Sequence, residues 1–139
     1  MVLVDTSIWS LFLRRDAARL NSLEGQWRRE FENLVASHSV AIIGAVRQEL
    51  LTGIREIAQF QRLKSILRAY PDADLETADY ELAADSSNRC QSAGIAGHPI
   101  DFLICAASVR RNWMIFTADK DFEQYQQVLP INLFKVLPA

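Results

Sequence analysis

Val2-Leu3-Val4-Asp5-Thr6-Ser7 is the stretch that decides the fold, because three apolar residues run without alternation and stop at an acid. Such a run is typical of a strand buried on both faces, as in a parallel sheet covered by helices. The Thr6 and Ser7 side chains can cap a following helix. Apolar residues then recur at helical spacing, so we predict a helix from Ile8 to about Arg15.

Strands and helices alternate along the rest of the chain. Further strands are predicted at residues 40–43 and 113–117, with an edge strand at 131–136. Helices are predicted at residues 23–37, from near Val46 through Leu51 and on through 60–67, at 78–93 with Thr77 as its cap, and at 100–111. Strands separated by helices favour βαβ units, so we expect an α/β fold with a mostly parallel sheet and helices on both faces.

Acidic residues stand where the predicted strands end. Asp5 ends the first strand, Glu49 lies in the helix after the second, and Asp119 and Asp121 directly follow the third. Ligands of open α/β sheets bind beyond the carboxyl ends of the strands, so we expect these acids to share that end. Asp101 opens the helix before the third strand, and it joins them only if that helix starts at the same end.

Carboxylates gathered in one place repel each other, and hard divalent cations relieve that repulsion. Such a cation can activate water and stabilise the charge that develops on a phosphodiester. Each acid also has a structural interpretation, which the residues alone leave open. Asp5 could cap a helix, Asp101 could complement a helix dipole, Asp119 could belong to a polar turn, and Glu49 could be a solvated residue.

Composition narrows the possible classes of protein. A net charge of −2 and a pI near 5.7 argue against a protein that coats nucleic acid by bulk charge. No apolar run approaches the roughly 20 residues of a membrane helix, and the first residues do not resemble a signal peptide, so we expect a cytoplasmic protein without membrane association. Cys90 and Cys105 are expected to be buried, reduced thiols.

Other chemistries find less support in the residues. The chain has no Walker loop, no dinucleotide glycine fingerprint and no nucleophile elbow. Its two histidines lack zinc spacing, His98 is expected in a loop or cap, and the tryptophans are expected in the core. One short stretch is rich in arginine and is either a solvated helix face or a contact for phosphates: Arg14, Arg15, Arg19, Arg28 and Arg29.

The pattern resembles the PIN domain, and within it the VapC-type toxins of bacterial toxin–antitoxin pairs. The resemblance covers nearly the whole chain and rests on the order and spacing of four pieces: Val4-Asp5-Thr6-Ser7, Glu49, Ile100-Asp101-Phe102-Leu103-Ile104 and Phe116-Thr117-Ala118-Asp119-Lys120-Asp121-Phe122. It implies a PIN-like three-layer α/β/α sandwich, with residues 1–139 as one domain. Cys105 and Asn112 depart mildly from the common pattern, which has a small Ala and a Gly there, although Asn can also adopt positive φ.

The same resemblance implies an endoribonuclease that depends on Mg²⁺ or Mn²⁺ and cleaves RNA phosphodiesters with metal-activated water. The metal ligands would be Asp5, Glu49, Asp101 and Asp119. Asp121 would be a further catalytic acid, and the polar supports would be Thr6, Ser7 and Thr117. It also implies a homodimer and a cognate antitoxin that blocks the site.

Two alternatives stay open at this point. One is a catalytically inactive PIN-like module that binds partners. The other is a receiver-type phosphotransfer domain, which would need paired acids at the end of the first strand, where Asp5 stands alone.

Overall fold

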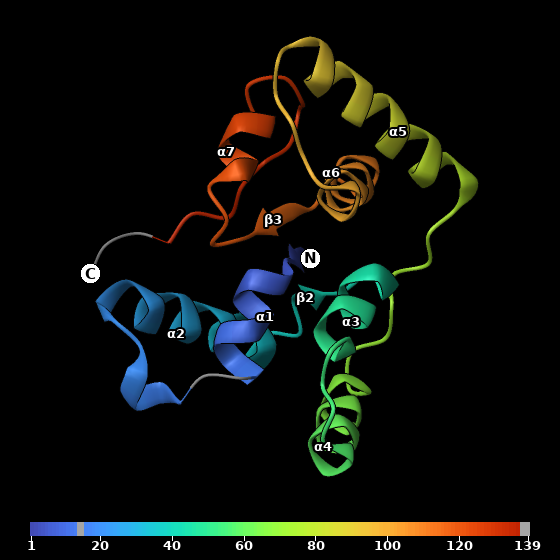
Figure 1. Cartoon of the computed structure of the whole chain (residues 1–139). Coiled ribbons are helices and arrows are strands. Elements are labelled where there is room, and N and C mark those ends of the chain that lie inside the picture. The colour runs from blue at the N-terminus through green and yellow to red at the C-terminus, as the bar shows by residue number, and fades with distance from the viewer. Residues whose placement is uncertain (14–15, 137–139) are drawn as a thin grey trace.

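Three short parallel strands form the centre of the protein in the computed structural model, which describes residues 1–13 and 16–136 (Figure 1). In chain order the elements are β1 (Val2–Val4), α1 (Thr6–Leu13), the 3₁₀ turn η1 (Ala17–Arg19), α2 (Ser22–Ala36), β2 (Val40–Ala41), α3 (Gly44–Leu51), α4 (Ile57–Leu67), α5 (Thr77–Ser92), α6 (Pro99–Arg111), β3 (Met114–Phe116) and α7 (Asp121–Tyr125). The predicted alternation of strands and helices is confirmed.

The strand order is β2-β1-β3, and both pairings are parallel. Val2 pairs with Val40 on one side and with Met114 on the other. The central strand is wholly apolar and buried, as an unalternating sequence predicts. The predicted edge strand at 131–136 is reduced to one bridge between Leu133 and Ile115, and a matching bridge at the other edge joins Ile42 to Asp72.

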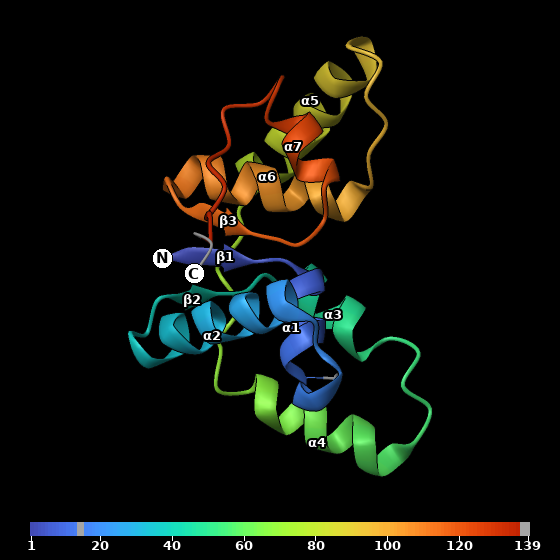
Figure 2. The same cartoon turned by 90° about the vertical axis from the view of Figure 1, so that its left-hand side faces the viewer.

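Helices cover both faces of the sheet, which confirms the three-layer α/β/α arrangement. Figure 1 shows α1 and α2 on one side of the strands, with α3 and α6 on the other. In the turned view, α5, α6 and α7 gather beside β3, and the helices from α1 to α4 gather beside β2, with β1 between the two groups (Figure 2). The carboxyl ends of all three strands therefore open at one end of the molecule.

Two predictions about helices in the first half of the chain differ from the structure. The helix expected to continue through residues 60–67 is interrupted, because α3 ends at Leu51 and α4 begins at Ile57. Gly53 lies between them with φ of +85°, a conformation that suits glycine and ends a helix. The first helix begins at Thr6, so the Thr6 and Ser7 side chains are not its cap. Its predicted end at Arg14 and Arg15 lies outside the described residues.

The ends of α6 follow the sequence closely. His98 is its N-cap, and its Nδ1 accepts a hydrogen bond of 3.3 Å from the Ile100 amide. Pro99 occupies the first turn, where its missing N–H costs nothing. Asn112 ends the helix in the left-handed conformation with φ of 58°. These caps fix where α6 starts, and therefore where Asp101 in its first turn lies.

A buried ion cluster joins α5 to α6. Asp79 is wholly buried, and its two carboxylate oxygens lie 2.7 Å from Arg111 Nη1 and 3.0 Å from Arg110 Nη1. Hydrogen bonds from Arg111 hold the pKa of Asp79 far below its ordinary value. Asp79 also accepts a 2.8 Å bond from the Glu76 amide, so Glu76, rather than the predicted Thr77, is the N-cap of α5.

The cysteine prediction is confirmed, since Cys90 and Cys105 are both buried and free. Burial raises the pKa of the Cys105 thiol well above its ordinary range, which keeps it protonated and unreactive. Across residues 1–13 and 16–136, no helix is long and apolar enough to cross a membrane.

Candidate metal centre

Asp5 lies at the carboxyl end of β1, with only 6% of its surface exposed. Its amide donates to the Phe116 carbonyl over 2.9 Å, which continues the pairing with β3. Its Oδ2 accepts from the Ser7 hydroxyl at 2.7 Å and from the Thr117 hydroxyl at 2.8 Å. Burial raises the pKa of Asp5, and these two donors oppose that shift. The carboxylate is thus fixed in position by the strand and by two hydroxyl groups.

The same two hydroxyl groups hold the loop that follows β3. Ser7 Oγ accepts from the Ala118 amide at 2.9 Å, and Thr117 Oγ1 accepts from the Asp119 amide at 3.0 Å. Asp119 in turn accepts a 2.9 Å bond from the Asp121 amide. The loop acids are therefore positioned relative to Asp5 by a continuous chain of hydrogen bonds through Ser7 and Thr117.

Three carboxylates converge beside this chain. One oxygen each from Asp101, Asp119 and Asp121 lies within 4.8 Å of the other two. Asp101 is half-buried, and its pKa is raised to about 6 by burial first and then by the charges of Asp5 and Asp119. Three carboxylates crowded in one place form a set of oxygen donors of the kind that a hard divalent cation prefers, so these residues fit Mg²⁺ or Mn²⁺.

Tyr125 is a member of the site that the sequence analysis missed. Its hydroxyl donates a 2.7 Å hydrogen bond to Asp101 Oδ2, and its ring is buried against Phe102 with the centroids 5.0 Å apart. Tyr125 comes four residues after Asp121 on α7, so helical spacing places the two on one face. That spacing was the only signal, and it does not reveal the contact with α6.

Glu49 and Thr6 stand apart from this arrangement. Glu49 lies half-buried on α3, which leaves the same end of the sheet, but among the described residues it is not one of the carboxylates within 4.8 Å. The Thr6 hydroxyl is buried without a hydrogen-bond partner in the part of the chain that the structure describes. The roles of both residues stay predictions.

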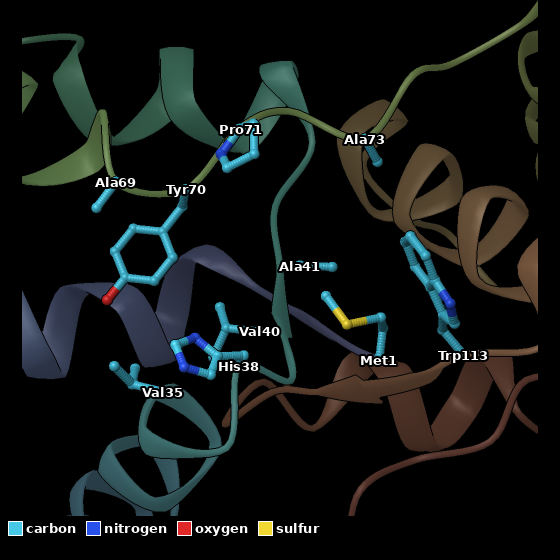
Figure 3. A pocket seen from close by; sticks show the side chains of 10 residues that line it. All are labelled: Met1, Val35, His38, Val40, Ala41, Ala69, Tyr70, Pro71, Ala73 and Trp113. Atoms are coloured by element: carbon cyan, nitrogen blue, oxygen red, sulfur yellow. The ribbon is translucent and has the colours of Figure 1, made fainter.

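A cavity of about 480 Å³ lies at the opposite end of the sheet. Met1, Val40 and Trp113 line it, and these residues stand where the three strands begin. Figure 3 shows Tyr70 and His38 on one side of it, Trp113 on the other and Met1 between them. Its lining is mostly apolar and contains no carboxylate, so it is not a cation site.

Comparison with solved structures finds chains of the same fold. The FitAcB structure from Neisseria gonorrhoeae superposes with a TM-score of 0.76 at 17% identity, over 97% of each chain. The VapBC2 structure from Rickettsia felis, bound to a DNA fragment from their promoter, gives a TM-score of 0.73 at 17% identity over 96% of this chain and 98% of that one. A toxin–antitoxin complex from Klebsiella pneumoniae gives 0.62 at 18% identity over 88% and 90%. At these identities the likeness concerns the fold.

No curated protein matches the sequence itself. The family profile described as the PIN domain, however, matches residues 2–128, which include every acid of the candidate metal centre. With this match over most of the sequence and a three-layer fold around parallel strands, the chain belongs to the PIN domain family.

Proposed function

We propose that this protein is a divalent-metal-dependent endoribonuclease and the toxin of a type II toxin–antitoxin pair. The observation that carries the proposal is the convergence of Asp101, Asp119 and Asp121 beside the buried Asp5, at the carboxyl end of a PIN-type sheet. Membership of the PIN family favours this function over a receiver-type phosphotransfer domain. The acidic cluster favours it over an inactive binding module.

The metal ligands in this proposal are Asp5, Glu49, Asp101 and Asp119, of which Asp101 and Asp119 lie in the cluster of three carboxylates. Asp121 is a further catalytic acid, because its carboxylate lies in the same cluster. When held by these acids, Mg²⁺ or Mn²⁺ would supply the positive charge that lets an anionic phosphodiester approach, and it would make water a better nucleophile.

The chain's own residues orient these groups. Ser7 and Thr117 hold the Asp5 carboxylate through their hydroxyl groups, and Tyr125 holds Asp101. Such outer hydrogen bonds fix the direction of the ligand oxygens. With water as the nucleophile, the products carry 5′-phosphate and 3′-hydroxyl ends.

RNA is the proposed substrate, with single-stranded loops favoured because their phosphates and bases are accessible. We further propose a homodimer of single-domain chains in the cytoplasm, blocked by a cognate antitoxin. The neighbours in fold include a structure from Klebsiella pneumoniae described as a toxin–antitoxin complex, which supports a partner of that kind. An antitoxin arginine could offset the acidic charge in place of metal, since its guanidinium pairs well with carboxylates.

The test is cleavage of a structured RNA by the purified chain with Mg²⁺, with Mg²⁺ plus excess chelator, and by an Asp101→Asn control. Cleavage in the first reaction alone, with 5′-phosphate products, is expected. Equal cleavage after chelation would refute the metal role, and 2′,3′-cyclic phosphate ends would refute water as the nucleophile. A strictly monomeric chain that is harmless when overexpressed alone would count against the toxin assignment.

A further inference from the structure

A groove of about 300 Å³ adjoins the candidate metal centre. Part of its lining is the loop at residues 117–120, which carries Asp119 of the acidic cluster. The rest comes from Leu23 and Trp27 on α2 and from residues 133–136, together with Glu123 on α7. A ligand bound at the acidic cluster can therefore extend into this groove.

The groove carries charges of both signs, because two lysines line it together with Asp119 and Glu123, and Asp119 is one of the acids that a bound metal ion would offset. Two of the three lysines in the sequence, Lys120 and Lys135, line it, and both are exposed. Neither forms an ion pair with any residue that the structure describes, whereas Arg47, Arg110 and Arg111 are paired to carboxylates. Unpaired ammonium groups beside a metal site are suited to the phosphates that flank a reacting phosphodiester.

The α2 side of the groove offers apolar surface. Leu23 is 49% exposed although it is a large apolar residue, and Trp27 is half-buried with part of its surface in the groove. Trp9, in contrast, is wholly buried. The prediction that the tryptophans lie in the core is therefore fully met by Trp9 and only partly by Trp27. Aromatic and apolar side chains beside cations form the usual binding surface for unpaired bases.

We propose that this groove binds the single-stranded RNA segment next to the scissile phosphodiester, with Lys120 and Lys135 on its phosphates and one base against Leu23 and Trp27. The proposal rests on the proposed ribonuclease function. RNA is favoured over a peptide as the occupant of the groove, because Lys120 and Lys135 are complementary to the phosphates of a polyanion.

Binding is measured by fluorescence anisotropy of a labelled 12-nucleotide single-stranded RNA with Mg²⁺, in an Asp101→Asn background that prevents cleavage. Lys135→Gln is expected to raise Kd about fourfold at 0.15 M salt and to reduce the slope of log Kd against log salt by about 0.7, the value for one lost contact to single-stranded phosphate. Lys64→Gln on α4, outside the groove, removes the same charge and should leave both quantities unchanged.

The apolar wall is tested by Leu23→Glu, which is expected to raise Kd about tenfold by repulsion of phosphate. The first turn of α2 tolerates an acid, so folding should be preserved, as a melting curve checks. The matched control is Tyr80→Glu, an exposed apolar residue in the first two turns of α5.

Equal Kd values for each variant and its control would overturn the groove assignment, even if the unaltered chain cleaves RNA. If the unaltered chain cleaves no RNA, the proposed function fails separately. RNA bound tightly with no effect of Lys135 or Leu23 would place the substrate elsewhere, and the groove would then be open to a peptide.

Discussion

The Tyr125 hydroxyl donates a 2.7 Å hydrogen bond to the Asp101 carboxylate, which has a pKa of about 6. The donor stabilises the ionised carboxylate and so lowers this pKa, against the effects of burial and of neighbouring acids. Metal binding requires the ionised form, so the cleavage rate should fall as pH drops through the range around 6.

Tyr125→Phe removes this donor and keeps the ring. We expect cleavage to fall about tenfold at neutral pH, as for loss of an outer hydrogen bond to a ligand. The acidic limb of the pH–rate profile should also move to higher pH, because Asp101 becomes harder to ionise. Tyr80→Phe, at an exposed position, serves as the control. If the rate falls while the acidic limb of the pH–rate profile stays in place, Tyr125 acts only through packing.

Asp5→Asn separates metal binding from capping. The change removes one charge from a group that Asp101 repels, so the metal-free protein should be as stable or more stable, by about 1 kcal/mol. Cleavage should be lost, and the rise in melting temperature on addition of Mn²⁺ should shrink. An Asn variant with an intact rate and an intact Mn²⁺ response would instead identify Asp5 as a cap.

Asp79→Asn tests the ion cluster between α5 and α6. Two arginines would lose their buried partner, and the free energy of unfolding should fall by about 3 kcal/mol at pH 7. Asp85→Asn is the control, on the exposed side of the same helix. Urea unfolding curves provide the measurement.

The contribution of Asp79 should also depend on pH. Its folded-state pKa is depressed, so the contribution is complete above the unfolded-state pKa of about 3.9 and is lost as pH falls below it. The difference in the free energy of unfolding between the parent and the Asn variant should therefore become smaller in acid. A difference that stays constant down to pH 3 would show that lost packing, rather than lost charge, causes the effect.

Gly97→Ala probes the packing behind Tyr125. An added Cβ would lie 2.4 Å from the Phe102 ring and 2.8 Å from the Tyr125 hydroxyl, so one of these groups must move. We expect a loss of about 1–3 kcal/mol in stability and slower cleavage. Gly25→Ala on α2 meets nothing closer than 3.7 Å and should stabilise by about 0.5–1 kcal/mol. Equal changes in stability for Gly97→Ala and Gly25→Ala would show that Gly97 is not crowded by Phe102 and Tyr125.

Several parts of the fold could be predicted from short stretches of sequence. The buried β1, the cap at His98 and the left-handed Asn112 each depend on a few neighbouring residues, and the structure confirms all three. The placement of Asp5 and Asp119 at one edge of the sheet is local in the same way, because Asp5 follows β1 and Asp119 lies in the loop after β3. Their role as metal ligands stays a prediction.

Long-range contacts could not be predicted from such stretches. The partnership of Asp79 with two arginines and the contact of Tyr125 with Asp101 arise where separate elements meet. The predicted last strand is shorter than expected for a similar reason. Among the described residues its pairing with β3 is the bridge between Leu133 and Ile115, where Ile115 donates to Asn132 and Phe134 donates to Ile115. Whether Glu49 joins the site depends on how α3 is inclined, which its own sequence does not encode.

The residues of the acidic cluster are far apart along the chain, so they are added at different times during synthesis. Translation adds Asp5 well before Asp101, and it adds Asp119 and Asp121 later still, after β3. A nascent chain that has not yet exposed β3 also lacks Thr117, which bonds the Asp5 carboxylate. The three carboxylates therefore come together only after β3 and the loop that follows it have been synthesised.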